Sequence, residues 1–435
     1  MDTRRAQLEL GWPLVLSLAA IHFCAFADRA VPAAFAPALR ESFRLSDAQL
    51  GALQGTVFIL PYALATLIGA AALARFHPLR IVAASMVAWT AACGTFALAS
   101  NLSQLLLARA ALGTGQALLA PAALAVLSSA TRPAATIAVS TFTAGSSSGR
   151  SGGLIAGGLL LALVTRLMSP PHAQDAWRIA SLWLLLPNIL LAGFLFRASG
   201  ASTGLLPDSS TGGMRDAIAG MMKEPRVFGG HLLASCAVIT IVQSGGAWAP
   251  SILHRTFALS PSMAALLFGV IVLACAPVGH LAAGRHIARA GHWSAPASLM
   301  IGGSVLASTC CLLLTWAGSA TGAAIGLCGL TVGGGAAAAA AMIGFQQLTT
   351  PDVRLPASAV YMTAVGLAGY GVGPLLTGAL SDVIGPSQNG LAQALLLTTG
   401  LSSMIVMSGV TLASGRWQRV RSQAQAGVRD EPAAA

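Results

Sequence analysis

The stretch that decides the fold is WPLVLSLAAIHFCAFADRAVPAAFAPAL, residues 12–39, an apolar run of membrane-spanning length that carries one acid, Asp28, near its outer third. An ionisable group at membrane depth costs about 2.5–3.5 kcal/mol, so Asp28 is by default a candidate functional residue. The alternative is a structural ion pair with Arg29 or with an arginine on a neighbouring helix. Every other acid falls at a segment end, in a connection or in a tail.

The composition indicates an integral membrane protein. Of the 435 residues, 55% are hydrophobic and 9% are charged, whereas a soluble domain carries about 25% charged residues. The apolar segments are about 20–30 residues long, which is the length of a membrane-spanning helix and not of a barrel strand. The formal net charge is +11, but the arginines gather on one side of the expected spans, which argues against nucleic acid as a partner. The seven cysteines show no metal-ligand or disulfide spacing.

The sequence predicts an all-α protein with twelve membrane-spanning helices. We expect them at residues 12–39, 49–74, 79–99, 104–129, 135–165, 177–196, 227–252, 263–286, 294–317, 321–348, 356–381 and 390–414. When the N-terminus is cytoplasmic, most arginines fall in cytoplasmic segments, and the reverse orientation violates the positive-inside rule. Both termini are therefore expected in the cytoplasm, and the plasma membrane, as a bacterial inner membrane, is the expected location.

The helices are expected to form two similar halves. The proposed division is a cytoplasmic tail at 1–11, a six-helix half at 12–197, a cytoplasmic loop at 198–226, a second six-helix half at 227–415 and a cytoplasmic tail at 416–435. FRLS at 43–46 matches FALS at 257–260, and Ala74-Arg75 matches Ala288-Arg289, both at an offset of 214 (257 − 43 and 288 − 74). Duplicated six-helix units are typical of transporters whose substrate site lies between the halves.

Several motifs resemble the major facilitator superfamily, most closely its spinster-like and anion:cation-symporter-like branches. They are Asp28-Arg29, LSDAQLG at 45–51, RAALGTGQA at 109–117, Trp177-Arg178, Trp248-Ala-Pro250, and GVGP at 371–374 with Gly378 and Ser381-Asp382. The resemblance extends over about residues 12–415. It implies the two-half fold, a functional monomer and a transporter instead of an enzyme.

The chain departs from this family pattern at two places. The family's cytoplasmic loop motif, Gly-x3-Asp-Arg, is reduced to Arg75 after the second helix and to Gly284 and Arg289 after the eighth, with alanine in place of the acid in both copies. A latch that this acid helps to form in the family is therefore weakened here or built differently. Spinster-like proteins also resemble one another in a glutamate of helix four, which is Gln116 here.

The resemblance assigns proton coupling to Asp28 and Arg109. Arg109 lies about 7 Å from the outer surface and Asp28 about 24 Å from the inner one, at 1.5 Å per residue, so the two can lie level in a core of about 30 Å. Burial favours the neutral form of a carboxyl group and a nearby cation favours the charged form. Asp28 could therefore be poised to load and release a proton, with Gln116 lining the same cavity as a neutral hydrogen-bonding group.

Arg150 is an unexpected cation near the middle of the fifth span. It could partner Asp28 or bind an anionic group of the substrate with its bidentate guanidinium; a structural ion pair and a misplaced span are the alternatives. Counting Asp28 against Arg29, Arg109 and Arg150 leaves a charge of +2 (3 − 1), which favours an anionic or zwitterionic solute. The expected solute is therefore a small organic molecule that is anionic or amphipathic. Further candidate substrate contacts are Arg29, Gln116, Gln243, Trp248, Tyr361 and Tyr370.

These features predict a proton-coupled secondary transporter, a symporter or an antiporter, for a small organic solute. The expected partners are that solute, protons and the lipid bilayer. No catalytic constellation, metal site or cofactor motif is visible. Two alternatives stay open: an uncoupled facilitator, and a transporter-like sensor or interaction protein that binds a solute without cycling, which the lost loop acids and Gln116 motivate.

Overall fold

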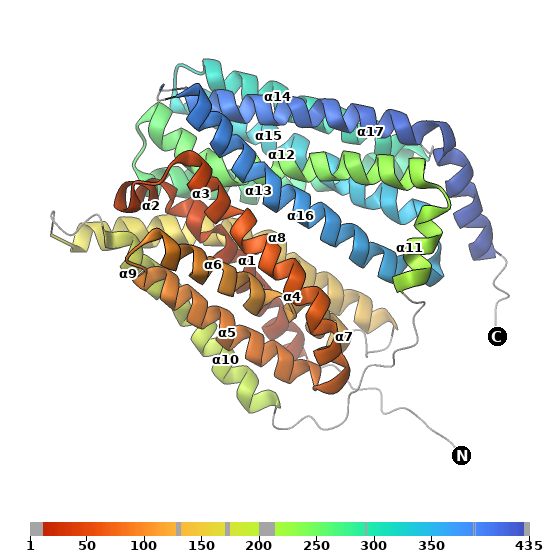
Figure 1. Cartoon of the computed structure of the whole chain (residues 1–435), viewed down its shortest axis with the longest axis horizontal. Coiled ribbons are helices and arrows are strands. Elements are labelled where there is room, and N and C mark those ends of the chain that lie inside the picture. The colour runs from red at the N-terminus through yellow and green to blue at the C-terminus, as the bar shows by residue number, and fades with distance from the viewer. Residues whose placement is uncertain are drawn as a thin grey trace. The chain divides into compact units, whose positions relative to one another are not determined.

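The computed structural model describes residues 12–127, 132–169, 175–199, 214–291, 294–385, 387 and 389–429, and these residues form helices with no strand among them (Figure 1). Twelve helical stretches in this part of the chain are long and apolar enough to cross a membrane, which confirms the predicted all-α fold. The expected tail at 1–11 lies outside the described residues, as do parts of the expected segments 198–226 and 416–435.

The helices are α1 Trp12–Ala34, α2 Ala36–Phe43, α3 Asp47–Gln54, α4 Thr56–Arg75, α5 Pro78–Leu98, α6 Leu102–Gln116, α7 Leu119–Leu127, α8 Arg132–Leu167, α9 Ala176–Trp183, α10 Leu185–Ser199, α11 Met214–Met222, α12 Pro225–Phe257, α13 Pro261–Ala290, α14 Ala295–Trp316, α15 Ala320–Leu348, α16 Pro351–Ile384 and α17 Gly390–Arg429.

Prolines explain why three of the expected spans are interrupted. A proline lacks the N–H that would bond the carbonyl four residues earlier, and its ring crowds that carbonyl. The first expected span ends at Ala34 because Pro37 opens the separate helix α2. Pro121 lies just after the α6–α7 break, and Pro187 lies just after the α9–α10 break. Pro277, in contrast, lies inside the continuous helix α13.

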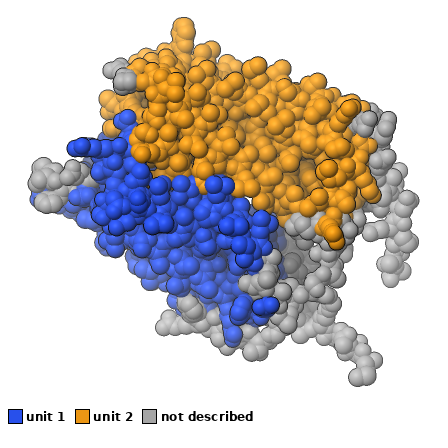
Figure 2. Space-filling model, viewed as in Figure 1, with its two compact units in different colours: residues 1–45, 57–208, 259–270 blue, residues 46–56, 209–258, 271–435 orange. Residues whose placement is uncertain are grey.

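The chain divides into two compact units, coloured separately in Figure 2. Unit 1 contains residues 1–45, 57–208 and 259–270, and unit 2 contains residues 46–56, 209–258 and 271–435. The segment 46–56 thus joins the later part of the chain, and the segment 259–270 joins the earlier part. The repeat offset of 214 maps 46–56 onto 260–270, so the two exchanged segments are equivalent positions of the repeat. The half boundaries proposed from the sequence stay a prediction.

In unit 1, α8 packs closely against α1 through glycines spaced four residues apart. A Cβ added at Gly145 would meet the backbone of Ala19, and one added at Gly149 would meet the backbone of Phe23. Gly153 has the same relation to Ala27. Small residues at this spacing let two helix backbones approach, which is the main way that helices associate in a lipid environment. This seam fixes the position of the α1 turn that carries Asp28.

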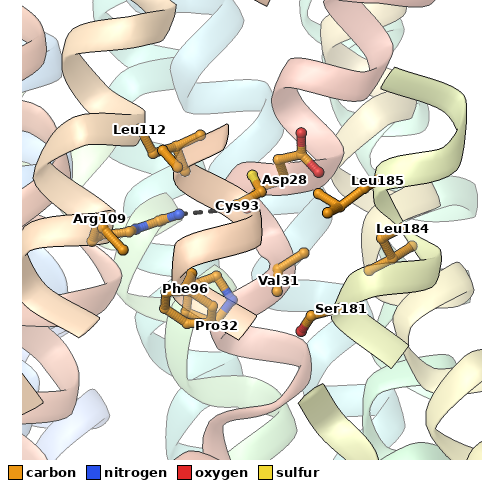
Figure 3. A pocket seen from close by; sticks show the side chains of 12 residues that line it. Asp28, Val31, Pro32, Cys93, Phe96, Arg109, Leu112, Ser181, Leu184 and Leu185 are labelled. Carbon is orange, nitrogen blue, oxygen red and sulfur yellow. Dashed lines mark hydrogen bonds between the residues drawn. The ribbon is translucent and has the colours of Figure 1, made fainter. Parts of the chain in front are cut away.

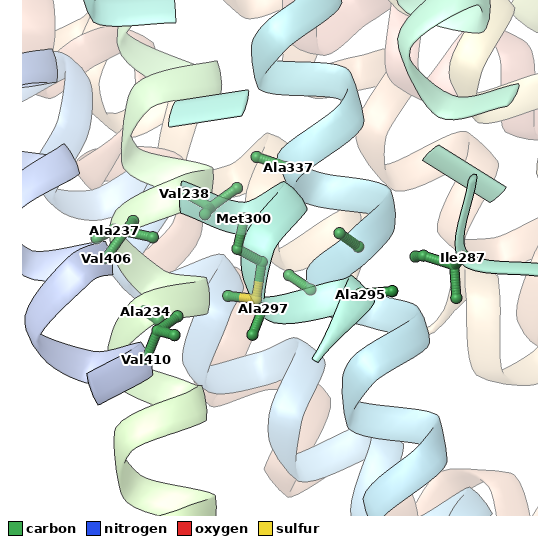
Figure 4. Packing of buried hydrophobic residues seen from close by; sticks show 12 residues of the cluster. Ala234, Ala237, Val238, Ile287, Ala295, Ala297, Met300, Ala337, Val406 and Val410 are labelled. Carbon is green, nitrogen blue, oxygen red and sulfur yellow. The ribbon is translucent and has the colours of Figure 1, made fainter. Parts of the chain in front are cut away.

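Unit 2 has a core of small and branched residues where α12, α14, α15 and α17 meet (Figure 4). Met300 of α14, Val238 of α12 and Ala337 of α15 belong to this cluster, together with Val406 and Val410 of α17. Such a core is stabilised by close packing, because lipid tails are as apolar as the side chains themselves.

The α1–α8 seam predicts a stability effect. Gly149→Ala should destabilise the protein by about 1–3 kcal/mol because the added methyl group overpacks the helix contact. Gly193→Ala in α10 is the matched control, since an added Cβ there has no heavy atom within 4 Å. Thermal unfolding of the purified variants in detergent measures the effect, and equal melting temperatures for the two variants would contradict the described seam.

Candidate functional site

Asp28 lies inside unit 1 with its carboxyl group bonded to a neutral amide. Asp28 is 5% exposed, and Nδ2 of Asn188 in α10 donates a hydrogen bond of 2.8 Å to the Asp28 Oδ2. The side chains of Trp89 and Cys93, both on α5, are its other neighbours. Figure 3 shows the carboxyl group of Asp28 beside the thiol of Cys93 and the side chain of Leu185. The acid predicted at membrane depth is therefore enclosed by α1, α5 and α10.

Arg109 is held by main-chain oxygens of the Asp28 turn. Its Nη2 donates to the carbonyl of Arg29 at 2.9 Å. Its Nη1 donates to the carbonyl of Asp28 at 3.4 Å, the bond drawn as a dashed line in Figure 3. The Asp28 carbonyl is available because Pro32, four residues later in α1, has no N–H to occupy it. Arg109 is 2% exposed, and the Cζ atom of its guanidinium lies 5.1 Å from the centre of the Phe58 ring. Arg109 is thus level with Asp28, as the depth estimate predicted.

Arg29 and Gln116 form a second polar pair at this turn. Arg29 Nε donates a 2.7 Å hydrogen bond to Gln116 Oε1, and Gln116 Nε2 donates to the carbonyl of Ala25 at 3.1 Å. The Arg29 guanidinium lies over the rings of Phe26 and Tyr62, at 4.3 Å and 5.1 Å from their centres. Gln116 is fully buried, so its amide orients Arg29 and fastens α6 to α1.

A small cavity adjoins Asp28, and neither Arg29 nor Gln116 lines it. Its volume is about 20 Å³, which is room for one water molecule. Apolar residues form most of its wall, and the polar groups are Asp28, Cys93, Arg109 and Ser181 (Figure 3). Ser181 Oγ donates to the carbonyl of Trp177 at 2.7 Å, so its lone pairs can accept from a water. The cavity could therefore hold a proton carrier next to the Asp28 carboxyl group.

The remaining cation predicted at membrane depth, Arg150, lies elsewhere in unit 1. It is half-buried in α8, directly after Gly149, and the wall of the Asp28 cavity does not include it. Arg75, the remnant of the loop motif at the end of α4, is exposed.

The other predicted contacts belong to unit 2. Trp248 is fully buried and its Nε1 donates to the carbonyl of Pro374 at 2.9 Å, which ties α12 to α16. Tyr361 stacks on Phe345 with ring centres 4.1 Å apart. Of the other two predicted substrate contacts, Gln243 is buried and Tyr370 is half-buried. Of the residues of the loop motif in this unit, Arg289 is exposed, and a Cβ added at Gly284 would have no heavy atom within 4 Å.

Asn188 and a charged group around Asp47 were not predicted from the sequence. Asn188 could have been found as the only carboxamide in the apolar sixth span. Asp47 was placed in a connection, where acids are ordinarily solvated, yet it is 4% exposed. Within unit 2, Arg255 donates to both of its carboxylate oxygens at 2.8 and 2.7 Å, and Ser381 Oγ donates to Oδ2 at 2.7 Å. Asp382 accepts from the backbone N–H groups of residues 47 and 48 at 2.9 and 2.8 Å. We call Asp47, Arg255, Ser381 and Asp382 the Asp47 cluster.

Comparison with known proteins gives a consistent result. A family model described as the Major Facilitator Superfamily matches residues 18–369. Among solved structures, a bacterial homologue of the human lysosomal transporter Spinster, inward-facing and unoccupied, is similar at 20% identity with a TM-score of 0.76, covering 97% of this chain and 98% of that one. The nucleoside transporter NupG is similar at 12% identity with a TM-score of 0.71, covering 92% and 98% of the two chains.

A D-xylose–proton symporter is similar at 14% identity with a TM-score of 0.65, covering 90% of this chain and 97% of that one. No curated protein sequence matches the chain. At these identities the structural likenesses show the fold alone.

The Arg29–Gln116 pair predicts a specific stability effect. Gln116→Leu should lower the free energy of unfolding by about 1–3 kcal/mol, because it leaves the Arg29 Nε–H and the Ala25 carbonyl without their partner. Gln116→Glu is the matched control, since its carboxylate can still accept from Arg29. Thermal unfolding of both variants distinguishes them, and a Gln116→Leu protein as stable as the unmodified one would contradict this arrangement.

Proposed function

We propose that this chain, which belongs to the major facilitator superfamily, couples the movement of a small organic solute to the binding of a proton at Asp28. Family membership itself makes the chain a multi-pass integral membrane protein and a transporter instead of an enzyme. The proton, the class of solute and the residues that bind them are the proposal. We further propose a functional monomer in a bacterial inner membrane, with both termini in the cytoplasm as the arginine distribution favours.

The observation that carries the proton proposal is the bond between Asp28 and Asn188. An amide can donate from its NH₂ group to a carboxylate, and it can accept at its oxygen from a protonated carboxyl group. Asn188 can therefore satisfy Asp28 in both protonation states after a rotation of its amide. Its Oδ1 is buried without a hydrogen-bond partner among the described residues, so it is available for the second role.

Arg109 supports the same proposal. Burial favours a neutral carboxyl group, whereas a nearby arginine, which stays charged, favours a carboxylate. Because the guanidinium of Arg109 is fixed by the carbonyls of residues 28 and 29, its charge stays near Asp28 whether or not Asp28 carries a proton. The two opposing influences allow both states of Asp28 to be populated during a transport cycle. One solved relative with this fold is a proton symporter by name, so the fold accommodates such coupling.

The solute is proposed to be an organic anion. Arg29 is half-buried, and none of the described acids lies within salt-bridge distance of its guanidinium. Its aromatic neighbours Phe26, Phe58 and Tyr62 suit a solute with an apolar body next to a carboxylate or phosphate. Arg150 is the second candidate for the anionic group. Arg29 and Arg150 are two of the three arginines that give the expected membrane-depth region its predicted positive charge.

The solute class can be tested by ligand-induced stabilisation. Organic anions should raise the melting temperature of the purified protein, because a ligand that binds the native state stabilises it by mass action. Lysolipids and hydrophobic cations complete the panel, and each compound is measured at mildly acidic and mildly alkaline pH. Arg29→Gln should lose the response and Arg150→Ala tests the second candidate. Stabilisation by cations or uncharged lipids alone would reject an anionic solute.

Proton coupling can be tested with an isosteric variant. Asp28→Asn should abolish solute accumulation driven by a pH gradient in proteoliposomes, while solute counterflow persists, because the variant retains the fold but cannot change charge. Asp175→Asn, which removes an exposed ion pair with Arg178, is the matched control.

Three other outcomes of this transport assay would each indicate a different function. Accumulation that survives in Asp28→Asn would reject Asp28 as the proton site. An unmodified protein with counterflow but no accumulation would be an uncoupled facilitator. Ligand binding without counterflow would identify a sensor that does not cycle.

A further inference from the structure

A groove on the surface of unit 2 lies between the first turn of α12 and the middle of α17. The two helices are neighbours (Figure 1). They touch at a pair of glycines, since a Cβ added at Gly230 would meet the carbonyl oxygen of Gly409 and one added at Gly409 would meet that of Gly230. The groove has a volume of about 790 Å³, which is within the range of small-molecule sites in proteins. None of its lining residues belongs to the Asp28 site.

The groove extends from membrane depth to the end of the membrane-spanning stretches. Its residues on α17 lie between Met407 and Gly415, at spacings of three and four residues that place them on one helix face. These eight steps (415 − 407) rise about 12 Å at 1.5 Å per residue. Gly415 ends one membrane-spanning stretch, and Arg226, on the other side of the groove, lies at the start of another. One end of the groove is therefore at a membrane surface.

The part of the groove within the membrane-spanning stretch has apolar side chains on its wall. Met407 is 48% exposed and Leu412 is 54% exposed. Because the hydrocarbon core holds no water, exposed apolar side chains at this depth contact lipid tails. An acyl chain can therefore lie along this wall.

Arg226 supplies the positive charge at the polar end of the groove. It is exposed, and none of the described acids lies within salt-bridge distance of it. A guanidinium binds a phosphate through two parallel hydrogen bonds, which is a favoured arrangement for this group. A phosphate at the membrane surface can therefore bind here.

Three hydroxyl groups of α17 supply hydrogen-bond acceptors beside Arg226. Ser408, Thr411 and Ser414 each donate to a main-chain carbonyl three or four residues earlier, at 2.8–2.9 Å. Their hydrogens are used within the helix, so their lone pairs stay available to accept. The groove thus combines a cationic donor for a phosphate with acceptors for N–H or O–H groups next to it.

We propose that this groove binds a phospholipid of the surrounding bilayer whose head group carries hydrogen-bond donors beside its phosphate. Arg226 holds the phosphate, the three hydroxyl groups accept from the head group, and an acyl chain lies along Met407 and Leu412. Phosphatidylethanolamine and phosphatidylglycerol have such donors, whereas the quaternary ammonium group of phosphatidylcholine has none. The site is separate from Asp28, Arg29 and Arg150 and does not depend on the proposed coupling.

Native mass spectrometry of the full chain in detergent, titrated with one lipid at a time, tests the proposal. Phosphatidylethanolamine should bind about tenfold more tightly than phosphatidylcholine with the same acyl chains, because hydrogen bonds from a charged donor contribute about that much. Phosphatidylglycerol should also bind more tightly than phosphatidylcholine. Glycerol phosphate, which lacks acyl chains, should not bind at the same concentrations.

Two of these outcomes would overturn the proposal. Equal retention of the three lipids would indicate unspecific contact with the lipid around the protein. Glycerol phosphate that binds as tightly as the lipids would indicate a site for a soluble phosphate compound.

Two variants locate the bound lipid. Arg226→Gln should weaken the binding of phosphatidylethanolamine about tenfold, and Arg285→Gln is the matched control, since it removes an exposed arginine near the end of α13 that does not line the groove. Gly415→Leu keeps Arg226 but fills the groove. An added Cβ at Gly415 has no heavy atom within 4 Å, and leucine favours a helix more than glycine does.

Gly415→Leu should therefore lose the lipid without a lower melting temperature in lipid-free detergent. Unchanged lipid binding in either Arg226→Gln or Gly415→Leu would overturn the proposal, as would an equal loss in Arg285→Gln.

Discussion

The carbonyl oxygen that Pro32 leaves free at the Asp28 turn of α1 is the point on which the polar interior of unit 1 depends. A polar group at membrane depth has no water to bond, so it must be satisfied inside the protein. The Asp28 carbonyl is satisfied by Arg109, and the carbonyls of residues 25 and 29 accept from Gln116 and Arg109. Both partners come from α6, and the carbonyl that Pro32 leaves free accepts one of the two bonds that hold Arg109 beside the acid.

This arrangement separates fixed charge from variable charge. Arg109 and Arg29 are held by main-chain and amide oxygens. The Asp28 carboxyl group accepts a hydrogen bond from a neutral side chain, Asn188, on a third helix. A carboxyl group whose partner bonds both of its forms can change charge without disturbing the bonds that hold α1 to α6. We infer that the fixed arginines set the electrostatic field at this site and that the Asp28–Asn188 pair responds to it.

Much of this could be predicted from the sequence, because hydropathy and arginine placement act locally. The twelve spans and the depth match of Asp28 and Arg109 follow from segment length and helix rise alone. The pairing of Asn188 with Asp28 and the pairs of the Asp47 cluster could not be found in that way, since the partners lie 160 and 208 or more residues apart in sequence. Gln116 was expected to line a cavity, but the structure commits its amide to Arg29 and Ala25. Local patterns predict which residues reach membrane depth, whereas side-chain pairing depends on how the helices pack.

Proton coupling at Asp28 requires that its carboxyl group binds and releases a proton inside the protein. Infrared difference spectroscopy of the protein in lipid, recorded as the pH is lowered, detects the carbonyl stretch of a protonated carboxyl group in an apolar setting. We expect such a band in the unmodified protein, its absence in Asp28→Asn, and a shift of its frequency in Asn188→Leu, where the amide partner is lost. Identical difference spectra for the unmodified protein and Asp28→Asn would contradict it.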